Sequence, residues 1–200
     1  MSLLEAVKNR HQPSTWDDMP AGTEVELVEL TKSSREYKSV MSEVNLRWRA
    51  LSGPEKIVRV QNPYLWGCYL LKKEECIKRS GCSVTEKVLF HVTSQSNIDS
   101  ITENNLDWRR SVRTKFGCGV SFSPSAGYGD TWCNRSIGRR RALIVAKVLV
   151  GDSHDGYYGT ELPSEGCDTT VGNSEQVYVK YYDHEFYPEY VIYYDSNVVI

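Results

Sequence analysis

One histidine has neighbours that suit chemistry. His91 follows the apolar run "VLF" and is followed closely by the hydroxyl residues Thr93 and Ser94. An imidazole at the end of a strand can exchange a proton or hold a ligand hydroxyl near neutral pH. A histidine in that place can also be purely structural, so its role depends on the elements that surround it.

Other catalytic arrangements find no support in the residue spacing. No cluster of His, Asp and Glu has the spacing of metal ligands, which argues against a metal-dependent hydrolase, and no metal is expected. The cysteines form no close pair of the kind that structural zinc sites use, and a chain of this size needs no disulfides. We expect thiols at all six positions, which are Cys68, Cys76, Cys82, Cys118, Cys133 and Cys167.

Length and composition indicate one globular domain. The chain has 200 residues and a formal net charge of -2, which gives no electrostatic reason to expect nucleic acid as a partner. The densest basic run, "GRRRA" at 138–142, is interpreted as a solvated loop. No segment reaches the roughly 20 apolar residues of a membrane helix, and the N-terminus lacks the apolar centre of a signal peptide. We therefore expect no membrane partner, a nuclear or cytoplasmic location, a polar tail over 1–12 and one domain over 13–200.

The first half of the chain predicts helices that alternate with short strands. An early strand has three candidates for inward-facing side chains, Val25, Leu27 and Leu30. Ser33 and Glu36 have the spacing of a capping box and predict the start of a helix. Apolar residues then recur at helical spacing at Tyr37, Val40, Met41, Val44 and Trp48.

A second helix follows the short strand "KIVRVQ". Asn62 is the expected N-cap, and Pro63 takes the first helical position, where its missing N–H costs nothing. The helix ends near Gly81. Its buried stripe consists of Leu65, Trp66, Tyr69 and Leu70.

The second half is mostly strand and loop. The short helix "SQSNIDSITENN" turns Ile98 and Ile101 inward. The remaining strands are "EKVLFHV", "GVSFS", "RALIVAKVLVG", "EQVYVKYY" and "EYVIYYD". Few helices separate these strands, so antiparallel pairing in an α+β domain is favoured over a doubly wound parallel sheet. The loop at 152–174 is long for a compact domain, which is typical of function or disorder.

Four motifs in order resemble one known family. They are "VLFHVTS", "KFGCGVSFSPSAGYGDTWC", "ALIVAKVLVG" and "YVKYYDHEFYPEYVIYY". Together they resemble the catalytic domain of the poly(ADP-ribose) polymerase family, the diphtheria-toxin-like ADP-ribosyltransferases. The upstream segments "STWDDM" and "VRVQNPYLWGCYLLKKE" look like the lead-in of the mono-ADP-ribosylating branch, so the resemblance covers 13–195. It implies split, twisted antiparallel β-sheets with a few flanking helices, and a cleft that binds NAD as substrate.

The resemblance assigns the purine half of that cleft to His91. Its ring would donate to the adenosine ribose hydroxyl, and Thr93 matches the small hydroxyl residue two places on. Between them Val92 replaces the family's glycine. That residue's backbone N–H and C=O would bind the nicotinamide carboxamide, and a β-branched residue can do so only where its φ is negative.

The nicotinamide half departs further from the family pattern. Ser121 stands where the family has a stacking tyrosine, a loss of about 1 kcal/mol by the aromatic-pair scale. Gly129 stands where the family has a serine that binds nicotinamide. Tyr128 matches an aromatic residue usual in the mono-transferase branch, and Trp132 lies where a second stacking ring is expected.

The position of the family's catalytic glutamate falls on Val177. Glu175, two residues upstream, would face the same side of the strand but lies about 6–7 Å away along its axis, so it is a poor substitute. Glu189 is interpreted as a solvent-facing strand carboxylate. Without a carboxylate at Val177 no polymer is expected, and members with an aliphatic residue there generally transfer one ADP-ribose to a protein acceptor.

Two hypotheses follow for this His91, Ser121 and Val177 constellation. One is a protein mono-ADP-ribosyltransferase, whose target choice would lie in the loops at 109–116 and 152–174. The other is a catalytically inactive module with the same fold that binds or scaffolds a partner. Losing one preorganised donor can cost about 10²–10³ in rate, so several losses leave both hypotheses open.

Overall fold

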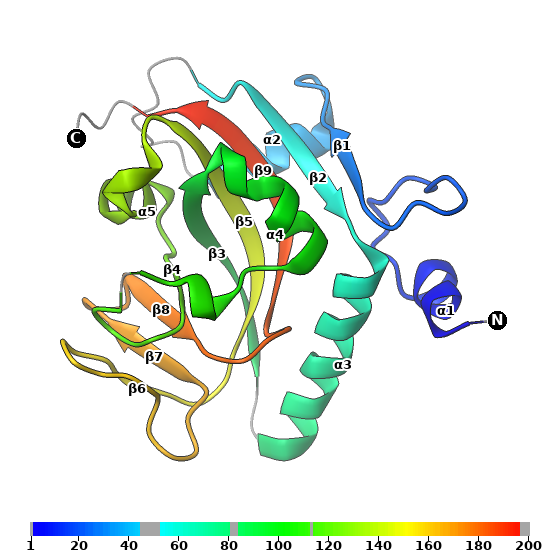
Figure 1. Ribbon diagram of the computed structural model, residues 1–200. Coiled ribbons are helices and arrows are strands. Elements are labelled where there is room, and N and C mark those ends of the chain that lie inside the picture. Colours follow the sequence, from blue (N-terminus) through cyan, green and yellow to red (C-terminus); the bar gives the residue numbers. More distant parts are fainter. Residues whose placement is uncertain (1, 45–52, 81–83, 113, 197–200) are drawn as a thin grey trace.

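The computed structural model describes residues 2–44, 53–80, 84–112 and 114–196, and in these residues it contains two β-sheets flanked by helices (Figure 1). The larger sheet has the strand order β1-β2-β9-β5-β3. Its strands are β1 (Glu26–Glu29), β2 (Lys56–Gln61), β3 (Thr85–Ser94), β5 (Arg140–Val150) and β9 (Phe186–Asp195). All the pairs in this sheet are antiparallel, as the sequence pattern predicted.

A smaller sheet has the order β4-β8-β7-β6. Its strands are β4 (Val120–Phe122), β6 (Ser153–Asp155), β7 (Thr169–Gly172) and β8 (Val177–Lys180). Only β6 and β7 run parallel among its described pairs. The two sheets make the split α+β arrangement that the motifs implied.

Strand β5 separates two cores because its side chains alternate between the faces of the larger sheet. Ala142, Ile144 and Ala146 pack with the smaller sheet, whose Phe122 and Tyr178 share that cluster. Leu143 and Val145 point to the opposite face. One strand therefore supports both layers.

Five helices and three short 3₁₀ turns cover these sheets in the described part of the chain. Helix α4 packs on the same face as the smaller sheet, whereas α2, α3 and α5 pack on the opposite face. The helices are α1 (Leu3–Arg10), α2 (Arg35–Glu43), α3 (Pro63–Ser80), α4 (Ile98–Asn104) and α5 (Ala126–Trp132). The 3₁₀ turns are Gln95–Asn97, Trp108–Arg110 and Arg135–Ile137.

The predicted start of α3 is confirmed. The Asn62 side chain accepts a hydrogen bond of 3.0 Å from the Leu65 N–H, and Pro63 is the first helical residue. Leu65, Trp66 and Tyr69 are buried, as the helical spacing predicted. A cap and an apolar stripe depend on neighbours in sequence, which is why they could be predicted.

The prediction of a polar tail at the N-terminus was wrong, because Leu3–Arg10 form α1 with a Ser2/Glu5 capping box. This helix packs against α3. Val7 lies against Gly67, and the Trp66 indole donates to the His11 carbonyl at 2.7 Å. A long-range contact holds a segment that is too short and polar to be recognised alone.

Two details of the β1–α2 segment also differ from the prediction. Leu27, expected to face inward, is 37% exposed, while Leu30 is buried. The cap of α2 is Ser34 rather than Ser33, and its side chain accepts from the Tyr37 N–H. The predicted continuation of the helix to Trp48 lies outside the described residues.

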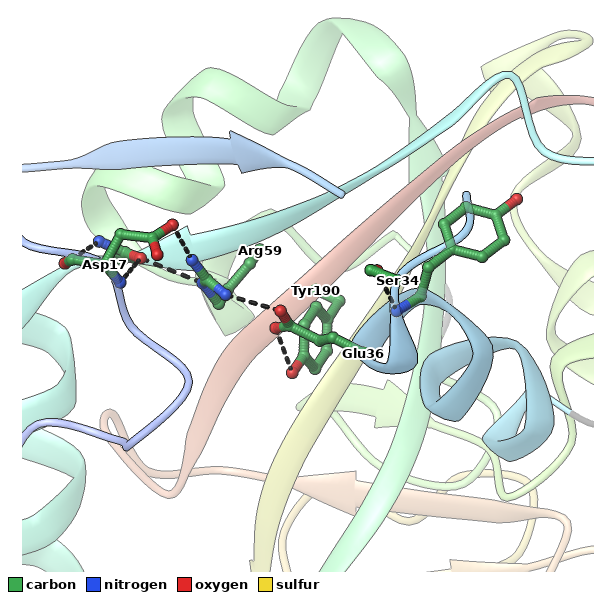
Figure 2. Close-up of polar contacts among 7 residues, drawn as sticks. Asp17, Ser34, Glu36, Arg59 and Tyr190 are labelled. Carbon is green, nitrogen blue, oxygen red and sulfur yellow. Dashed lines mark hydrogen bonds and ion pairs between the residues drawn. The ribbon is translucent and has the colours of Figure 1, made fainter. Parts of the chain in front are cut away.

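Arg59 of β2 joins the N-terminal segments to the sheet. Figure 2 shows its guanidinium between the carboxylates of Asp17 and Glu36. Glu36 also accepts from the Tyr190 hydroxyl of β9 at 3.0 Å. The Arg59 side chain is only 4% exposed, so these acceptors replace the water that a buried cation loses. The segment around residue 17 and helix α2 are thereby fixed to one strand.

The long loop predicted at 152–174 contains β6 and β7. The segment between them exposes Tyr157, Tyr158 and Leu162. The strands are three and four residues long, which is too short to show a clear alternation in sequence.

Candidate functional site

One cleft of about 960 Å³ collects all eight residues singled out in the sequence. It lies between the end of β3, the strands β4 and β8, and the helices α4 and α5. The eight residues are His91, Val92, Thr93, Ser121, Tyr128, Gly129, Trp132 and Val177. Pockets for small molecules and cofactors typically measure about 300–1,000 Å³, so the cleft is of ligand size.

His91 has one ring nitrogen bound within the protein. Its Nδ1 lies 2.9 Å from the Ser121 carbonyl oxygen. A carbonyl oxygen can only accept, so Nδ1 must carry a proton. Burial lowers the pKa of His91, although the bond to the Ser121 carbonyl acts in the opposite direction. The neutral ring is favoured, and its Nε2 is then a hydrogen-bond acceptor.

This geometry bears on the hydrogen-bond direction expected for His91. The resemblance implied that the ring donates to a ribose hydroxyl. With Nδ1–H pointing at Ser121, the neutral ring offers only an acceptor at Nε2, so a ligand hydroxyl bound there would have to donate. The ring also packs edge-on against Phe122, with their centroids 5.9 Å apart, which helps fix its orientation.

Thr93 also has a partner inside the protein. Its Oγ1 accepts from the Asn97 side-chain amide at 2.9 Å, and the residue is buried. A hydroxyl that accepts one bond keeps its own proton to donate. Asn97 was not predicted from sequence, and it lines the cleft beside Thr93.

Val92 presents its backbone to the cleft. Strand β3 ends the larger sheet, and Phe90 exchanges both backbone hydrogen bonds with Ser123 on its outer side. Backbone groups two residues apart in a strand point to the same side, so the Val92 N–H and C=O also point away from β5. Val92 is not among the residues with positive φ, so the condition that its replacement of glycine required is met.

The Val92 side chain points to α5 and meets Gly129. It belongs to the buried cluster that includes Phe90, Ala126 and Leu143. A Cβ atom placed on Gly129 would lie 3.3 Å from Val92 Cγ2, which is closer than carbon atoms normally pack. The two departures from the family motifs are therefore in contact.

Two aromatic rings stand on α5 at the cleft. Tyr128 and Trp132 have centroids 6.2 Å apart, and the Tyr128 hydroxyl accepts from the Asn173 amide at 3.1 Å. Trp132 is 55% exposed and lies at the open side rather than plugging the space near Ser121. Ser121 itself is half-buried.

Val177 is buried at the start of β8 and forms an apolar cluster with Val179 and Tyr181. Phe116 and Tyr128 pack against this cluster. This end of the cleft is therefore apolar where the family's glutamate was expected.

Neither nearby glutamate replaces that carboxylate. Glu175 was predicted on the strand, but it lies in the preceding turn with φ of 62° and is exposed. It accepts from the hydroxyl of Tyr178, whose side chain packs on the opposite face of β8 from Val177. Glu189, interpreted as solvent-facing, has a side chain that is only 18% exposed and lies 3.5 Å from Lys147. Burial raises its pKa.

One wall of the cleft, which includes Asp107, Arg109, Arg110, Asp183 and His184, carries most of its charged residues. Its carboxylates among the described lining residues are Asp107 and Asp183, and both pair with Arg109. His184 also lines this wall, with φ of 67° and a buried Nδ1 that has no hydrogen-bond partner in the described chain. Sequence reasoning missed His184, and its place inside the "YYDHEFYPEY" motif was the available signal.

A buried network holds α5 in place. The Asp130 carboxylate accepts from Arg141 at 2.7 Å, from the Tyr194 hydroxyl at 2.7 Å and from the Ser196 hydroxyl at 2.9 Å. The Arg141 and Asp130 side chains are 1% and 5% exposed. Since Gly129 and Trp132 belong to the same helix, this network fixes their distance from the larger sheet.

Other kinds of site are not found in the described residues. No group of three or more His, Cys, Asp or Glu there could hold a metal ion. No disulfide joins the described cysteines, and Cys82 lies outside them. None of the described helices is both long and apolar enough to cross a membrane.

The fold and the cleft define a class of α+β domain in which two split β-sheets flank a cleft of ligand size at the end of β3. The chain matches the poly(ADP-ribose) polymerase catalytic domain over residues 34–177. It therefore belongs to that family.

Curated relatives cover most of this chain. The human protein mono-ADP-ribosyltransferase PARP14 is 30% identical over 90% of it, and human PARP12 is 32% identical over 85%. Mouse PARP11 is 27% identical over 90%. The aligned part is 11%, 26% and 63% of these relatives, so the chain spans less than two thirds of their length.

Proposed function

We propose that this domain binds NAD in the cleft and transfers one ADP-ribose to a side chain of an acceptor protein. What supports the proposal is the union of three features in one cleft: the acceptor Nε2 of His91, the outward backbone of Val92 and the rings of Tyr128 and Trp132. The family membership and the mono-ADP-ribosyltransferase relatives point the same way.

Each feature has a task in binding. A ribose hydroxyl of the adenosine half would donate to His91 Nε2. The carboxamide of the nicotinamide half can both donate and accept, so it matches the paired N–H and C=O of Val92. Tyr128 and Trp132 would supply aromatic surface next to the nicotinamide ring. Together these contacts would hold both ends of the dinucleotide and orient its glycosidic bond.

The transfer breaks the bond between the ribose C1′ and the nicotinamide nitrogen. Nicotinamide leaves with the bonding electrons, and the positive charge that develops on the ribose is trapped by a Glu, Asp, Cys or Ser of the acceptor, which gives up a proton if it carries one. Val177 supplies no carboxylate to stabilise that charge. An acidic acceptor would bring its own, which favours a single transfer over polymer formation.

A second function is favoured by the apolar surroundings of Val177. Because both described carboxylates of the cleft pair with Arg109, none is placed to assist the reaction. A domain of this kind could bind NAD or a partner without catalysing transfer.

The test incubates the purified domain with labelled NAD and follows incorporation into the domain and into added protein. His91→Ala should abolish the label, because it removes the ribose contact. His154→Ala is the matched control, since His154 lies on β6 outside the cleft. Label that persists unchanged in His91→Ala would refute the site. A thermal shift with NAD but no label would favour the binding function. The absence of both the label and the thermal shift would refute NAD binding itself.

A further inference from the structure

Val92 and Gly129 are two positions whose side chains share one space. Among the described residues outside α5, Val92 Cγ2 is the atom that lies within 4 Å of a Cβ built on Gly129. The separation of 3.3 Å would require one of the two residues to move. Any residue other than glycine at 129 therefore competes with the isopropyl group of Val92.

Neither side of this contact can yield easily. Val92 is 8% exposed and packs in the cluster of Phe90, Ala126 and Leu143. A β-branched side chain also has few accessible rotamers. On the other side, the residue after Gly129 is Asp130, whose carboxylate is held by Arg141, Tyr194 and Ser196. Helix α5 therefore cannot shift away without breaking buried polar contacts.

The contact has a direct effect on the cleft. The Val92 backbone presents a donor and an acceptor on the outer side of β3, while its side chain occupies the room beside α5. A hydroxyl side chain at position 129 of α5 could add a hydrogen bond to a ligand held there, but its Cβ would crowd Val92 Cγ2 at 3.3 Å. The ligand is left with backbone groups on one side and methyl groups on the other.

We propose that Val92 and Gly129 act as one steric unit that limits the affinity of the cleft for an aromatic carboxamide at the edge of β3. This inference rests on the proposed binding of NAD, whose nicotinamide is such a carboxamide. The space that a side chain at position 129 of α5 would fill is occupied by the Val92 side chain of β3. The adenosine half, which lies with His91, is unaffected by the unit.

The experiment compares the wild-type domain with Val92→Ala, Gly129→Ser and the double variant. The melting temperature without ligand reports the steric contact. Gly129→Ser and Val92→Ala should each lower it, and the double variant should lose less than the sum of the two single losses. Val145→Ala with Gly129→Ser is the matched control, because Val145 is a buried valine of the same cluster that lies beyond 4 Å of the Cβ position. That pair should be additive.

Binding is measured with two probes, nicotinamide and ADP-ribose. The double variant Val92→Ala/Gly129→Ser should bind nicotinamide about tenfold more tightly than wild type, because it gains room and one hydroxyl. ADP-ribose affinity should stay within about twofold, since that probe has no carboxamide ring. Val92→Gly with Gly129→Ser is a second route to the same space if the first double variant folds poorly.

The possible results separate the inference from the proposed function. Additive melting temperatures for Val92 and Gly129 would overturn the steric unit. A second outcome is that the melting temperatures are coupled, the double variant binds nicotinamide no more tightly than wild type, and wild type binds ADP-ribose. That result would overturn the proposed limit on affinity but would leave NAD binding intact. Failure of wild type to bind ADP-ribose would overturn the NAD site, and the affinity claim would fall with it.

Discussion

Asp130→Ala should be among the most damaging single substitutions in this domain. The change removes the carboxylate that accepts from Arg141, Tyr194 and Ser196, all in a region closed to water. It leaves the Arg141 guanidinium, whose side chain is 1% exposed, without its counter-charge. Breaking one partner of a buried ion pair typically costs about 3–5 kcal/mol of unfolding free energy.

That loss converts to a large thermal effect. For a domain of this size, each kcal/mol corresponds to about 2–4 °C in melting temperature, so the expected decrease is about 6–20 °C. Urea denaturation followed by tryptophan fluorescence gives the free energy directly. Glu74→Ala is the control, because the exposed Glu74–Lys78 pair on α3 should contribute no more than about 0.5 kcal/mol.

A double variant tests the physical reason. Asp130→Ala with Arg141→Met removes the unpaired charge, so part of the stability should return. A loss below about 1 kcal/mol in Asp130→Ala, or a double variant no better than the single one, would refute the claim that this ion pair anchors α5.

Three further predictions concern stability. Arg59→Met should lower the free energy of unfolding by about 2–3 kcal/mol in urea titration, because it leaves the half-buried Glu36 without its cation; no change would contradict the role drawn in Figure 2. Burial raises the pKa of Glu185 to about 7 from its usual 4.5, so the folded state keeps a proton that the unfolded state has lost. Wild-type stability relative to Glu185→Gln should therefore fall as pH rises from about 4.5 to about 7, and a pH-independent difference in melting temperature would be inconsistent with this. Gly119→Ala would place Cβ 2.3 Å from the Lys180 carbonyl oxygen; it should cost about 1–3 kcal/mol by displacing β4 from β8, and wild-type stability in calorimetry would disprove that contact.

Much of the fold could be predicted because it depends on local patterns. The long strands β3, β5 and β9 carry enough apolar residues to be recognised, and the Asn62–Pro63 start of α3 needs only neighbours in sequence. The short strands β6 and β7 and helix α1 were missed. Helix α1 is held by the distant helix α3, and β6 and β7 are too short to show an alternating pattern.

The linear motifs alone singled out eight residues that all line the cleft, and these lie in or directly before three of the four motifs. Tertiary structure decided how those residues are used. The proton of His91 is fixed on Nδ1 by the carbonyl of Ser121, thirty positions away. Glu175 has a left-handed backbone conformation in the turn before β8, so it does not lie on the strand. The crowding between Val92 and a side chain at position 129 depends on the packing of α5 against β3. Residue type determines which groups can do chemistry, but distance and direction between them arise only when distant segments pack together.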